Sequence, residues 1–318
     1  MSNATDTSAP ERPSQLTAVP VRHRGRWVGM AVLAVIVTMF VHMLVTNDAF
    51  EWSFMWHNMF RPPVLRGART TLELTVLAML IGVAFGIVLA VMRLSPNPVI
   101  RGTAWAYTWF FRAVPRLVLC ILFGNLGILF QKTSRINFGV PLGNLLGLPH
   151  GGRIFDTDAN TLLAGFSAGL LALAMSEAAY MAEIVRAGIL AVDAGQNEAA
   201  QALGMSRMLT MRRIVLPQAM RVILPPTGNE TIAMLKDTSL VAFVPAYELF
   251  FQLEAVGSRT FKVFPMLVAA TLWYLAMTSV LLVGQHFLEK RFSRGVAGRT
   301  GKTRKPKPPV PAGGMGGM

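Results

Sequence analysis

Long apolar runs alternate with short polar stretches along most of the chain. A helix needs roughly 20 mostly apolar residues to cross the hydrocarbon core of a bilayer, and six segments approach or meet this length. We therefore predict six membrane-spanning helices. The segments are residues 27–45, 71–92, 105–130, 162–190, 222–244 and 265–287.

Two of these segments are less regular than the others. The third is interrupted by two arginines and a proline at residues 112–116, so we expect its helix to be broken there. The fifth is the weakest span, because it contains the charged residues Glu230, Lys236 and Asp237. Charged side chains inside a span are costly and mark either a substrate path or a paired bundle interior.

The first segment follows a basic cluster at residues 22–26. A basic flank before an apolar run is also the pattern of a cleaved signal peptide. This run is long, however, no small-residue cleavage site stands out, and further spans follow. We interpret it as an uncleaved helix with its N-terminus inside. Residues 1–26 are rich in Pro, Ser and Thr and are expected to be disordered up to the basic cluster.

Composition favours a membrane protein over a soluble one. Of the 318 residues, 53% are hydrophobic and only 14% are charged, whereas an average soluble domain carries about 25% charged residues. The net charge of +14 would also suit a nucleic-acid-binding protein. A run of basic residues, however, directly follows the last apolar segment, as expected for the cytoplasmic flank of a span. We therefore expect one all-α helical bundle and no nucleic-acid partner.

The basic residues also orient the chain. With the N-terminus inside, the inner regions are residues 93–101, residues 191–221 and the C-terminal tail, and they carry the positive excess that cytoplasmic loops show. Both termini are therefore expected in the cytoplasm. The tail, residues 289–318, is rich in Lys, Pro and Gly and is expected to be disordered. Residues 131–160 are rich in Gly, Pro and Asn and are expected to form an outer loop.

The most informative stretch is the inner loop at residues 195–217. Residues 198–203 are strong helix formers, and Gly204 permits a left-handed turn or a close backbone approach. Residues 207–213 can form a second short helix, which we expect Pro217 to stop. Two short helices joined by a tight turn would make a compact knob on the cytoplasmic face. Such a knob is suited to receive force from a soluble partner.

The order of residues in this loop resembles the signature loop of ABC importer permeases. Glu-Ala-Ala is followed after three residues by Gly, after nine more by Ile, and after one more by Leu-Pro. The flanking stretches at residues 178–189, 216–219 and 235–240 are similar to the polar amino-acid branch of that family. The resemblance covers about residues 67–287. The matching loop positions are Glu198, Ala199, Ala200, Gly204, Ile214, Leu216 and Pro217.

The resemblance implies a role for these residues and for the neighbouring Arg207. In that family the loop forms a coupling helix that docks into a groove on the ATP-binding subunit. The resemblance also implies a five-helix core of the type I importers at residues 67–288, preceded here by an additional helix and outer loop at residues 27–66. The chain would import a polar amino acid across the bacterial cytoplasmic membrane by alternating access.

The same resemblance implies partners and excludes others. ATP would be hydrolysed by separate ATP-binding cassette subunits, an external binding protein would deliver the amino acid, and a second permease subunit, identical or related, would complete the pore within the lipid. The chain itself is expected to be no enzyme and to hold no cofactor. Four charged residues lie on segments that the family uses to line its translocation path, although structural pairing is equally compatible with them. These residues are Arg112, Glu177, Lys236 and Asp237.

The sequence departs from the family pattern near Arg112. Residues 112–115 are Arg-Ala-Val-Pro where the family often has Arg-Gly-Thr-Pro, and Arg116 follows where an apolar residue is more usual. The cargo therefore stays open, with an opine, an osmolyte or a sulfur compound as alternatives. Two other classes are a gated channel without an ATPase, which the signature at residues 198–217 argues against, and a membrane enzyme, which would need a catalytic cluster that is not visible.

Two further motifs do not support chemistry in this chain. Residues 301–303, Gly-Lys-Thr, resemble the end of a phosphate-binding loop, but the required upstream glycine is replaced by Val296 and the stretch lies in the tail. We therefore expect no ATP binding by this chain. The five histidines are scattered and Cys120 is the single cysteine, so no metal site is predicted.

Two local patterns within the spans predict helix packing rather than transport. Glu183 and Arg186 are three residues apart on one helix, which favours a local ion pair. Glycines recur at four-residue spacing and suit close helix packing in lipid. These glycines are Gly82 with Gly86 and Gly165 with Gly169.

Overall fold

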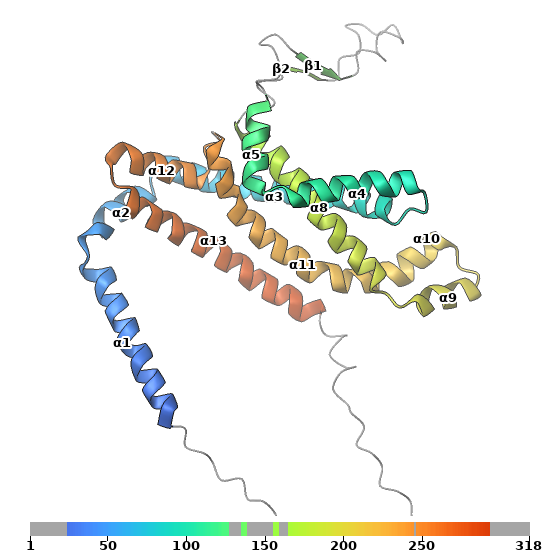
Figure 1. The fold of residues 1–318 in the computed structure, drawn as a ribbon, viewed down its shortest axis with the longest axis horizontal. Helices are drawn as coiled ribbons and strands as arrows, with labels where there is room; N and C mark the ends of the chain where they lie inside the picture. The colour runs from blue at the N-terminus through green and yellow to red at the C-terminus, as the bar shows by residue number, and fades with distance from the viewer. Residues whose placement is uncertain (1–23, 127–134, 139–154, 159–164, 245, 293–318) are drawn as a thin grey trace, which may run out of the picture. The chain divides into compact units, whose positions relative to one another are not determined.

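The structure is a computed structural model, shown in Figure 1, and its residues group into two compact units that divide after Phe50. We describe each unit by itself. The predicted disorder at residues 1–23 and 293–318 lies outside the described residues, whereas residues 24–26 and 289–292, also predicted as tails, are helical. The structure describes residues 24–126, 135–138, 155–158, 165–244 and 246–292.

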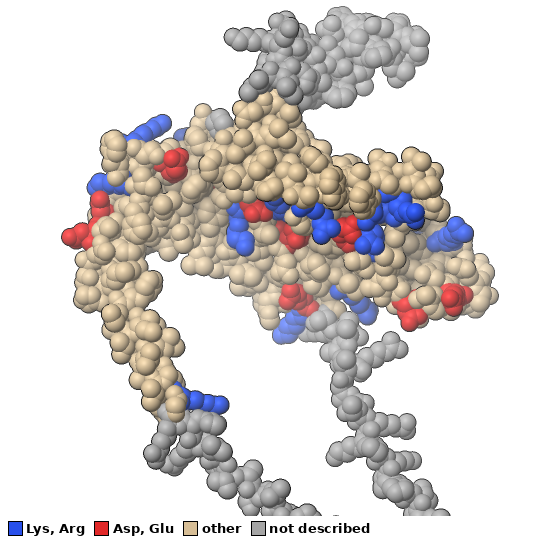
Figure 2. All heavy atoms as spheres, in the orientation of Figure 1, with Lys and Arg blue, Asp and Glu red and all other residues tan. Residues whose placement is uncertain are grey.

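The first unit contains one long apolar helix. α1 spans Arg24–Thr46, and the short 3-10 helix η1, Asp48–Phe50, follows it. All side chains of residues 25–43 are exposed, and on the face seen in Figure 2 the charge of this helix lies at its N-terminal end. A helix that is apolar on every side is suited to lipid rather than to water. The first predicted span is therefore confirmed as a helix that is long and apolar enough to cross a membrane.

The second unit is a helical bundle, so the all-α prediction is confirmed (Figure 1). Within the described residues of the whole chain, four helices are long and apolar enough to cross a membrane, or five if the bent pair α4–α5 counts as one span. The later predicted spans correspond to α3, α4 with α5, α8, α11 and α13, but α11, the predicted weakest span, is not among the helices counted as apolar enough. The elements are α2 Trp52–Met59, α3 Pro62–Arg93, α4 Pro98–Ala113, α5 Arg116–Asn125, β1 Arg135–Phe138, β2 Phe155–Asp158, α8 Gly165–Leu190, α9 Ala194–Ala202, α10 Arg207–Thr210, the π-helical turn η4 Met211–Val215, α11 Leu216–Asp237, the 3-10 helix η5 Thr238–Phe243, α12 Leu249–Thr260 and α13 Val263–Phe292.

Glycines bring the neighbours of α8 close to it. A Cβ atom built on Gly82 of α3 would lie 2.7 Å from the Cβ and Cγ atoms of Glu177, and one built on Gly86 would lie 2.6 Å from the Cβ atom of Met181. A Cβ atom built on Gly169 of α8 would lie 2.1 Å from the Cγ1 atom of Val241 in η5. Small residues allow helices to approach closely where lipid provides no hydrophobic driving force. The predicted packing role is confirmed at these three glycines.

α4 and α5 form the predicted broken span. Asn97 caps α4, because its Oδ1 atom accepts a hydrogen bond from the backbone N–H of Val99 at 2.9 Å, and Pro98 occupies the first turn. Pro115 is the N-cap residue of α5, and the axes of the two helices differ by 101°. Proline cannot continue α4, since it lacks an N–H group and clashes with the preceding turn. The bend makes Arg116 the first residue of α5.

The helix that follows the inner loop does not stop at Pro217, which corrects the prediction. α10, η4 and α11 follow one another without a break. Pro217 stands just after the π-helical turn η4, and a local change of winding of this kind lets a helix continue past a proline. The fifth predicted span therefore begins at Leu216 rather than at residue 222, and α11 ends at Asp237, where η5 takes over.

Glu248 connects α3, α12 and α13 through its buried carboxylate. Its Oε2 and Oε1 atoms accept hydrogen bonds from the backbone N–H groups of Phe250 at 2.8 Å and Phe251 at 2.6 Å, which caps α12. Thr71 of α3 and Tyr274 of α13 donate their hydroxyl groups to Oε2 at 3.3 Å and 3.1 Å. A buried carboxylate with four donors is well satisfied, so we interpret Glu248 as a structural residue.

The predicted outer loop at residues 131–160 contains regular structure. β1 and β2 pair antiparallel, with Arg135 opposite Asp158 and Phe138 opposite Phe155. The prediction of a plain loop is therefore wrong at these two strands. Each strand has only four residues, which is too short for an alternating pattern to stand out in a Gly- and Pro-rich stretch.

Candidate functional site

α8 presents a carboxylate to the interior of the second unit. Glu177 lies near the middle of α8 and is fully buried. The side chain of Arg116 reaches it from the start of α5, and Glu230 and Asp237 approach from α11. Their seven-residue spacing places Glu230 and Asp237 on one face of that helix. We refer to Arg116, Glu177, Glu230 and Asp237 as the charged cluster.

Arg116 holds the charged cluster together. Its Nη1 atom lies 2.5 Å from Oδ2 of Asp237, and its Nη2 atom lies 3.1 Å from Oε2 of Glu177 and 3.4 Å from Oε2 of Glu230. The exposed fraction of the side chains rises from 0% for Glu177 through 24% for Glu230 to 32% for Asp237. The cluster therefore has a buried end at α8 and a partly open rim at α11. Figure 2 shows acidic and basic side chains side by side in a band below α4.

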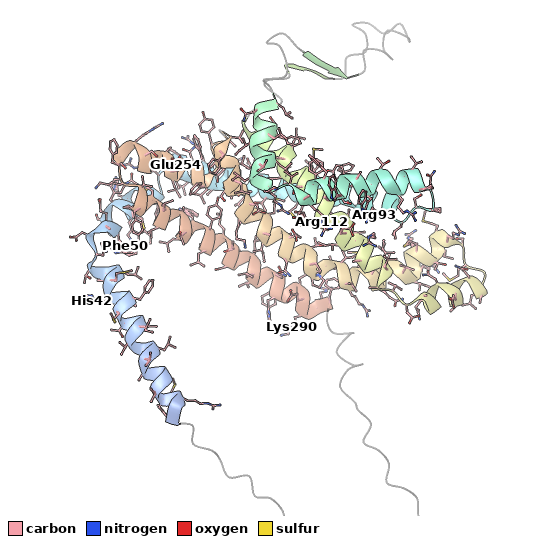
Figure 3. All side chains as sticks on the ribbon, in the orientation of Figure 1. His42, Phe50, Arg93, Arg112, Glu254 and Lys290 are labelled. Carbon is pink, nitrogen blue, oxygen red and sulfur yellow. The ribbon has the colours of Figure 1, made fainter. Side chains whose placement is uncertain are left out.

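An aromatic ring lies beside the cluster. Tyr180 follows Glu177 by one turn of α8, and the Cζ atom of Arg116 lies 4.8 Å from the centre of its ring. The Cζ atom of Arg112, which Figure 3 labels on α4, lies 5.6 Å from the same centre. A cation over an aromatic face is attracted by the ring quadrupole. The ring therefore adds a second kind of cation-binding contact next to the carboxylates.

Three of the four residues predicted for the substrate path meet here. Glu177 and Asp237 belong to the charged cluster, and Arg112 lies next to it. Lys236 does not join them, although it precedes Asp237 in the sequence. It is exposed and lines a separate groove together with residues of η5, α12 and α13, among them Tyr274.

The four residues predicted for the substrate path do not include Arg116, Glu230 or Tyr180, although Glu230 is one of the charges within the fifth predicted span, which are compatible with a path or with structural pairing. Each carried a signal in the sequence. Arg116 stands where the family usually has an apolar residue, Glu230 precedes Asp237 by two helical turns, and Tyr180 follows Glu177 by one turn. None of these sequence features identifies which side chains interact, because all three carboxylates are far from Arg116 along the chain.

The cluster has a surplus of negative charge. One guanidinium faces three carboxylates, which leaves a formal charge of −2. The Oε1 atom of Glu177 is buried and has no hydrogen-bond partner among the described residues. A buried acceptor without a partner is costly, and charges interact strongly away from water. The arrangement is therefore suited to a guanidinium or ammonium group. Among the described residues, no group of three or more His, Cys, Asp or Glu side chains is placed to hold a metal ion.

The inner loop folds into the predicted pair of short helices, which we call the knob (α9 and α10). α9 ends in a Schellman motif, in which the N–H of Met205 donates to the carbonyl of Ala200 at 3.0 Å and the N–H of Gly204 donates to the carbonyl of Gln201 at 2.9 Å. Gly204 has φ of +74°, so the predicted left-handed turn is confirmed. The side chain of Ser206 then caps α10.

The knob displays apolar side chains on its surface. Leu203 and Met208 are 81% and 76% exposed, and among the residues that the structure describes no atom lies within 4 Å of a Cβ atom built on Gly204. Exposed apolar side chains on a projecting turn are typical of a surface that a partner covers. Of the other residues predicted for coupling, Ala200 is buried and Ile214 is half-buried. The remaining ones are exposed, and they are Glu198, Ala199, Arg207, Leu216 and Pro217.

An ion-pair bridge links the C-terminal end of α3 to the C-terminal half of α8, the helix that precedes the knob in sequence. The Oε2 atom of Glu183 accepts hydrogen bonds from Nε and Nη2 of Arg186 at 2.9 Å and 2.8 Å, so the predicted local pair is confirmed. The Oε1 atom of the same carboxylate accepts from Nη2 of Arg93 at 3.1 Å. Arg93 is the last residue of α3 and is labelled in Figure 3. The bridge therefore couples α3 to the helix that leads into the knob.

Comparison with known proteins gives consistent matches. The model of a family described as "Binding-protein-dependent transport system inner membrane component" matches residues 82–294. The arginine transport system permease protein ArgU of Corynebacterium glutamicum is 43% identical over 286 residues, which cover 89% of this chain and 85% of that protein. The probable glutamine ABC transporter permease protein GlnM of Bacillus subtilis is 32% identical over 224 residues, covering 70% of this chain and 90% of that protein.

Solved structures agree in fold. The crystal structure of an amino acid ABC transporter with histidines superposes with a TM-score of 0.58 at 35% identity and covers 72% of this chain and 94% of that one. A chain of the inward-facing MetNI methionine ABC transporter superposes with a TM-score of 0.54 at 18% identity. At that identity the second likeness concerns the fold alone.

Proposed function

The chain belongs to the family of binding-protein-dependent transport system inner membrane components, and we propose that its cargo is an amino acid with a cationic side chain. It is a multi-pass protein of the cytoplasmic membrane and the permease subunit of an ABC importer for amino acids. The permease is a transport component and not an enzyme. The family assignment does not specify which kind of amino acid is carried, because that depends on the residues inside the helical bundle.

One observation carries the proposal of a cationic cargo. The charged cluster holds two more carboxylates than its one guanidinium can neutralise, and the buried Oε1 atom of Glu177 has no partner among the described residues. A guanidinium or ammonium group would supply the missing donor and reduce the surplus negative charge. The likeness to an arginine permease over most of the chain supports the same chemistry.

The neighbouring residues suit the other parts of such a cargo. Glu177 and Asp237 would hold the cationic end, and the ring of Tyr180 would lie against it. Arg112, beside the same ring, is the cation available for the α-carboxylate of the amino acid. Glu230 would add to the negative electrostatic potential at the partly exposed rim of the charged cluster. Three of the residues predicted for the path therefore keep that role in the proposal.

The knob would couple the permease to a separate ATP-binding subunit. The exposed residues Leu203 and Met208 would pack into a groove of that subunit, with Gly204 at the turn between them. Further partners would be an external binding protein, a second permease subunit that is identical or related, and membrane lipid. In this arrangement both termini face the cytoplasm, since basic residues flank α1 and α13 on that side.

The continuous helix α10–η4–α11 suggests how the knob acts on the cluster. Its helical segments follow one another from Arg207 to Asp237, with Pro225 and Pro226 inside α11, and α11 carries both Glu230 and Asp237. A displacement of the knob by the ATP-binding subunit would therefore move these two carboxylates relative to Glu177, which stands on α8. The affinity of the site for the cargo would be higher in one state of the transport cycle and lower in the other, as alternating access requires.

Reconstitution tests the cargo. The permease is placed in liposomes with its ATP-binding subunit and binding protein, and ATP-driven uptake of arginine and lysine is compared with that of glutamine and glutamate. We expect import of the cationic amino acids, and a reduction of roughly tenfold or more in Glu177→Gln and Asp237→Asn, as for the loss of a close charge pair. Glu254→Gln is the matched control, because Glu254 is an exposed carboxylate on α12, well apart from Arg112 in Figure 3.

The alternatives give different results in the same assay. An importer of opines, osmolytes or sulfur compounds would show no uptake of any of the four amino acids. A gated channel would conduct without ATP and would not co-purify with an ATP-binding subunit. A membrane enzyme would convert the cargo instead of accumulating it. Uptake restricted to glutamine or glutamate would contradict the proposal of a cationic cargo and leave the transporter class in place.

A further inference from the structure

Arg116 occupies the place that a cationic cargo would need. Its guanidinium lies within 3.4 Å of carboxylate oxygens of Glu177, Glu230 and Asp237 and over the ring of Tyr180. These contacts are the ones that the guanidinium of a bound arginine or the ammonium of a bound lysine would make. The chain therefore places its own cation in a cation site.

Arg116 also stands between the rim of the cluster and its buried end. The carboxylates of Asp237 and Glu230 are 32% and 24% exposed, the side chain of Arg116 is 12% exposed, and that of Glu177 is 0% exposed. A cargo cation that enters from the rim meets Arg116 before it meets Glu177. It reaches the unpartnered oxygen of Glu177 only if the guanidinium of Arg116 moves aside.

The position of Arg116 in the chain permits such a movement. It is the first residue of α5, directly after the 101° bend at Pro115, and its guanidinium is held by carboxylates and by the ring of Tyr180. Two of its three carboxylate partners stand on α11, which continues into the knob. Movement of the knob would change the hold of Asp237 and Glu230 on Arg116 while Glu177 stays on α8.

We propose that Arg116 is a tethered counter-ion that competes with the cationic cargo for Glu177. The inference rests on the proposed function, since it presumes a cationic amino acid. In the empty transporter, Arg116 neutralises part of the acidic surplus and keeps Glu177 from binding other cations. When cargo arrives, its cation displaces Arg116 from Glu177. When the cargo leaves, Arg116 returns, which weakens cargo binding and favours release.

The test compares Arg116→Met with Arg112→Met. Each variant is purified with its ATP-binding subunit in lipid nanodiscs, and equilibrium binding of radiolabelled arginine is measured without ATP. Because a competitor is lost, we expect Arg116→Met to bind arginine about tenfold more tightly or better, the order of effect known for close charge pairs. Arg112→Met, which removes a neighbouring cation from the same ring, is expected to bind arginine more weakly. ATP-driven uptake by Arg116→Met is expected to slow, because release is slower.

Guanidinium ion provides a second readout that a purely structural role would not give. Millimolar guanidinium chloride is expected to fill the place of the missing side chain in Arg116→Met, to weaken arginine binding and to restore part of the uptake rate. The wild-type protein and Arg116→Lys, which keeps a cation on a long side chain, are expected to respond little.

The outcomes separate the inference from the proposed function. If the wild-type protein imports only neutral or acidic amino acids, the proposed function fails. If it imports arginine but Arg116→Met binds arginine more weakly, Arg116 is a ligand of the cargo and the inference fails alone. Unchanged affinity for arginine would show that Arg116 serves only in structural ion pairs. The inference would then fail while the proposed function stands.

Removing Arg116 leaves three carboxylates without a cation, which can prevent assembly. The same binding measurement is then made on Arg116→Met/Glu230→Gln against Glu230→Gln, and the same tightening is expected. If the double variant also fails to assemble, Arg116 is structural and the inference is overturned.

Discussion

Gly82 of α3 lies directly against the side chain of Glu177 of α8, so that a Cβ atom at position 82 would stand 2.7 Å from both the Cβ and the Cγ atom of the glutamate. The close approach of the two helices thus fixes where the buried carboxylate of the charged cluster can lie. Gly82, which has no functional side chain, therefore controls the position of the carboxylate of Glu177.

Gly82→Ala is therefore expected to disturb the cluster. The added methyl group forces Glu177 or α3 to shift, and overpacking of this kind typically costs about 1–3 kcal/mol. We expect a lower melting temperature in detergent and a reduced uptake of the cationic amino acid. Gly102→Ala on α4 is the matched control, since a Cβ atom there meets no atom within 4 Å. Equal behaviour of the two variants would show that the contact between Gly82 and Glu177 is not needed.

Gly204→Asp is expected to break coupling without unfolding the permease. The positive φ of Gly204 costs a residue with a side chain about 1 kcal/mol, and no atom of the described residues lies within 4 Å of a Cβ atom built there. The charge is thus harmful only where a partner covers the turn. We expect a nearly normal melting temperature, loss of complex formation with the ATP-binding subunit, and loss of ATP-driven uptake.

Glu198→Lys serves as the comparison within the knob. Glu198 is exposed, and a charge at the rim of an interface usually contributes less than a packed turn. Its effect on docking is expected to be smaller than that of Gly204→Asp. Normal docking and normal uptake with Gly204→Asp would remove the reason for assigning the coupling role to the knob.

Glu248→Ala is expected to destabilise the second unit. The substitution leaves the backbone N–H groups of Phe250 and Phe251 and the hydroxyl group of Tyr274 without their acceptor, and each lost buried partner costs about 1–3 kcal/mol. Glu248→Gln keeps one acceptor oxygen and should fall between the wild-type protein and Glu248→Ala. The measurement is thermal unfolding in detergent, with Glu254→Ala as the exposed control. An unchanged melting temperature in Glu248→Ala would refute the structural role.

The orientation of the chain is open to cysteine labelling. Single cysteines are introduced at Ser14, Ser293 and Asp158, and intact cells are treated with a membrane-impermeant maleimide. We expect labelling only at position 158, because the termini are assigned to the cytoplasm and residues 131–160 to the outer side. The native Cys120 is buried and gives little background. Labelling of the Ser293 variant from outside would reverse the assignment.

The sequence by itself determined the features that depend on neighbours along the chain. Length and apolar content identified the helices, since a helix in lipid must satisfy its own backbone groups over about 20 residues. The turn at Gly204 follows from glycine's access to positive φ, and the pair of Glu183 with Arg186 follows from the rise of one helical turn. The mistaken stop at Pro217 came from the local rule that proline breaks a helix interior, whereas here the helix continues past Pro217 and also holds Pro225 and Pro226.

Only the tertiary structure decided which charges meet. Arg116 is 61 residues from Glu177, 114 from Glu230 and 121 from Asp237 along the chain, and no periodicity relates positions on three different helices. Lys236 and Asp237 are adjacent in sequence, yet a step of one residue turns the side chain by about 100° around a helix, so one lines a separate groove and the other binds Arg116. Which face of α11 is turned inward is set by its packing against α8, where Gly188 accommodates Ile223, and such packing depends on the shapes of both helices at once.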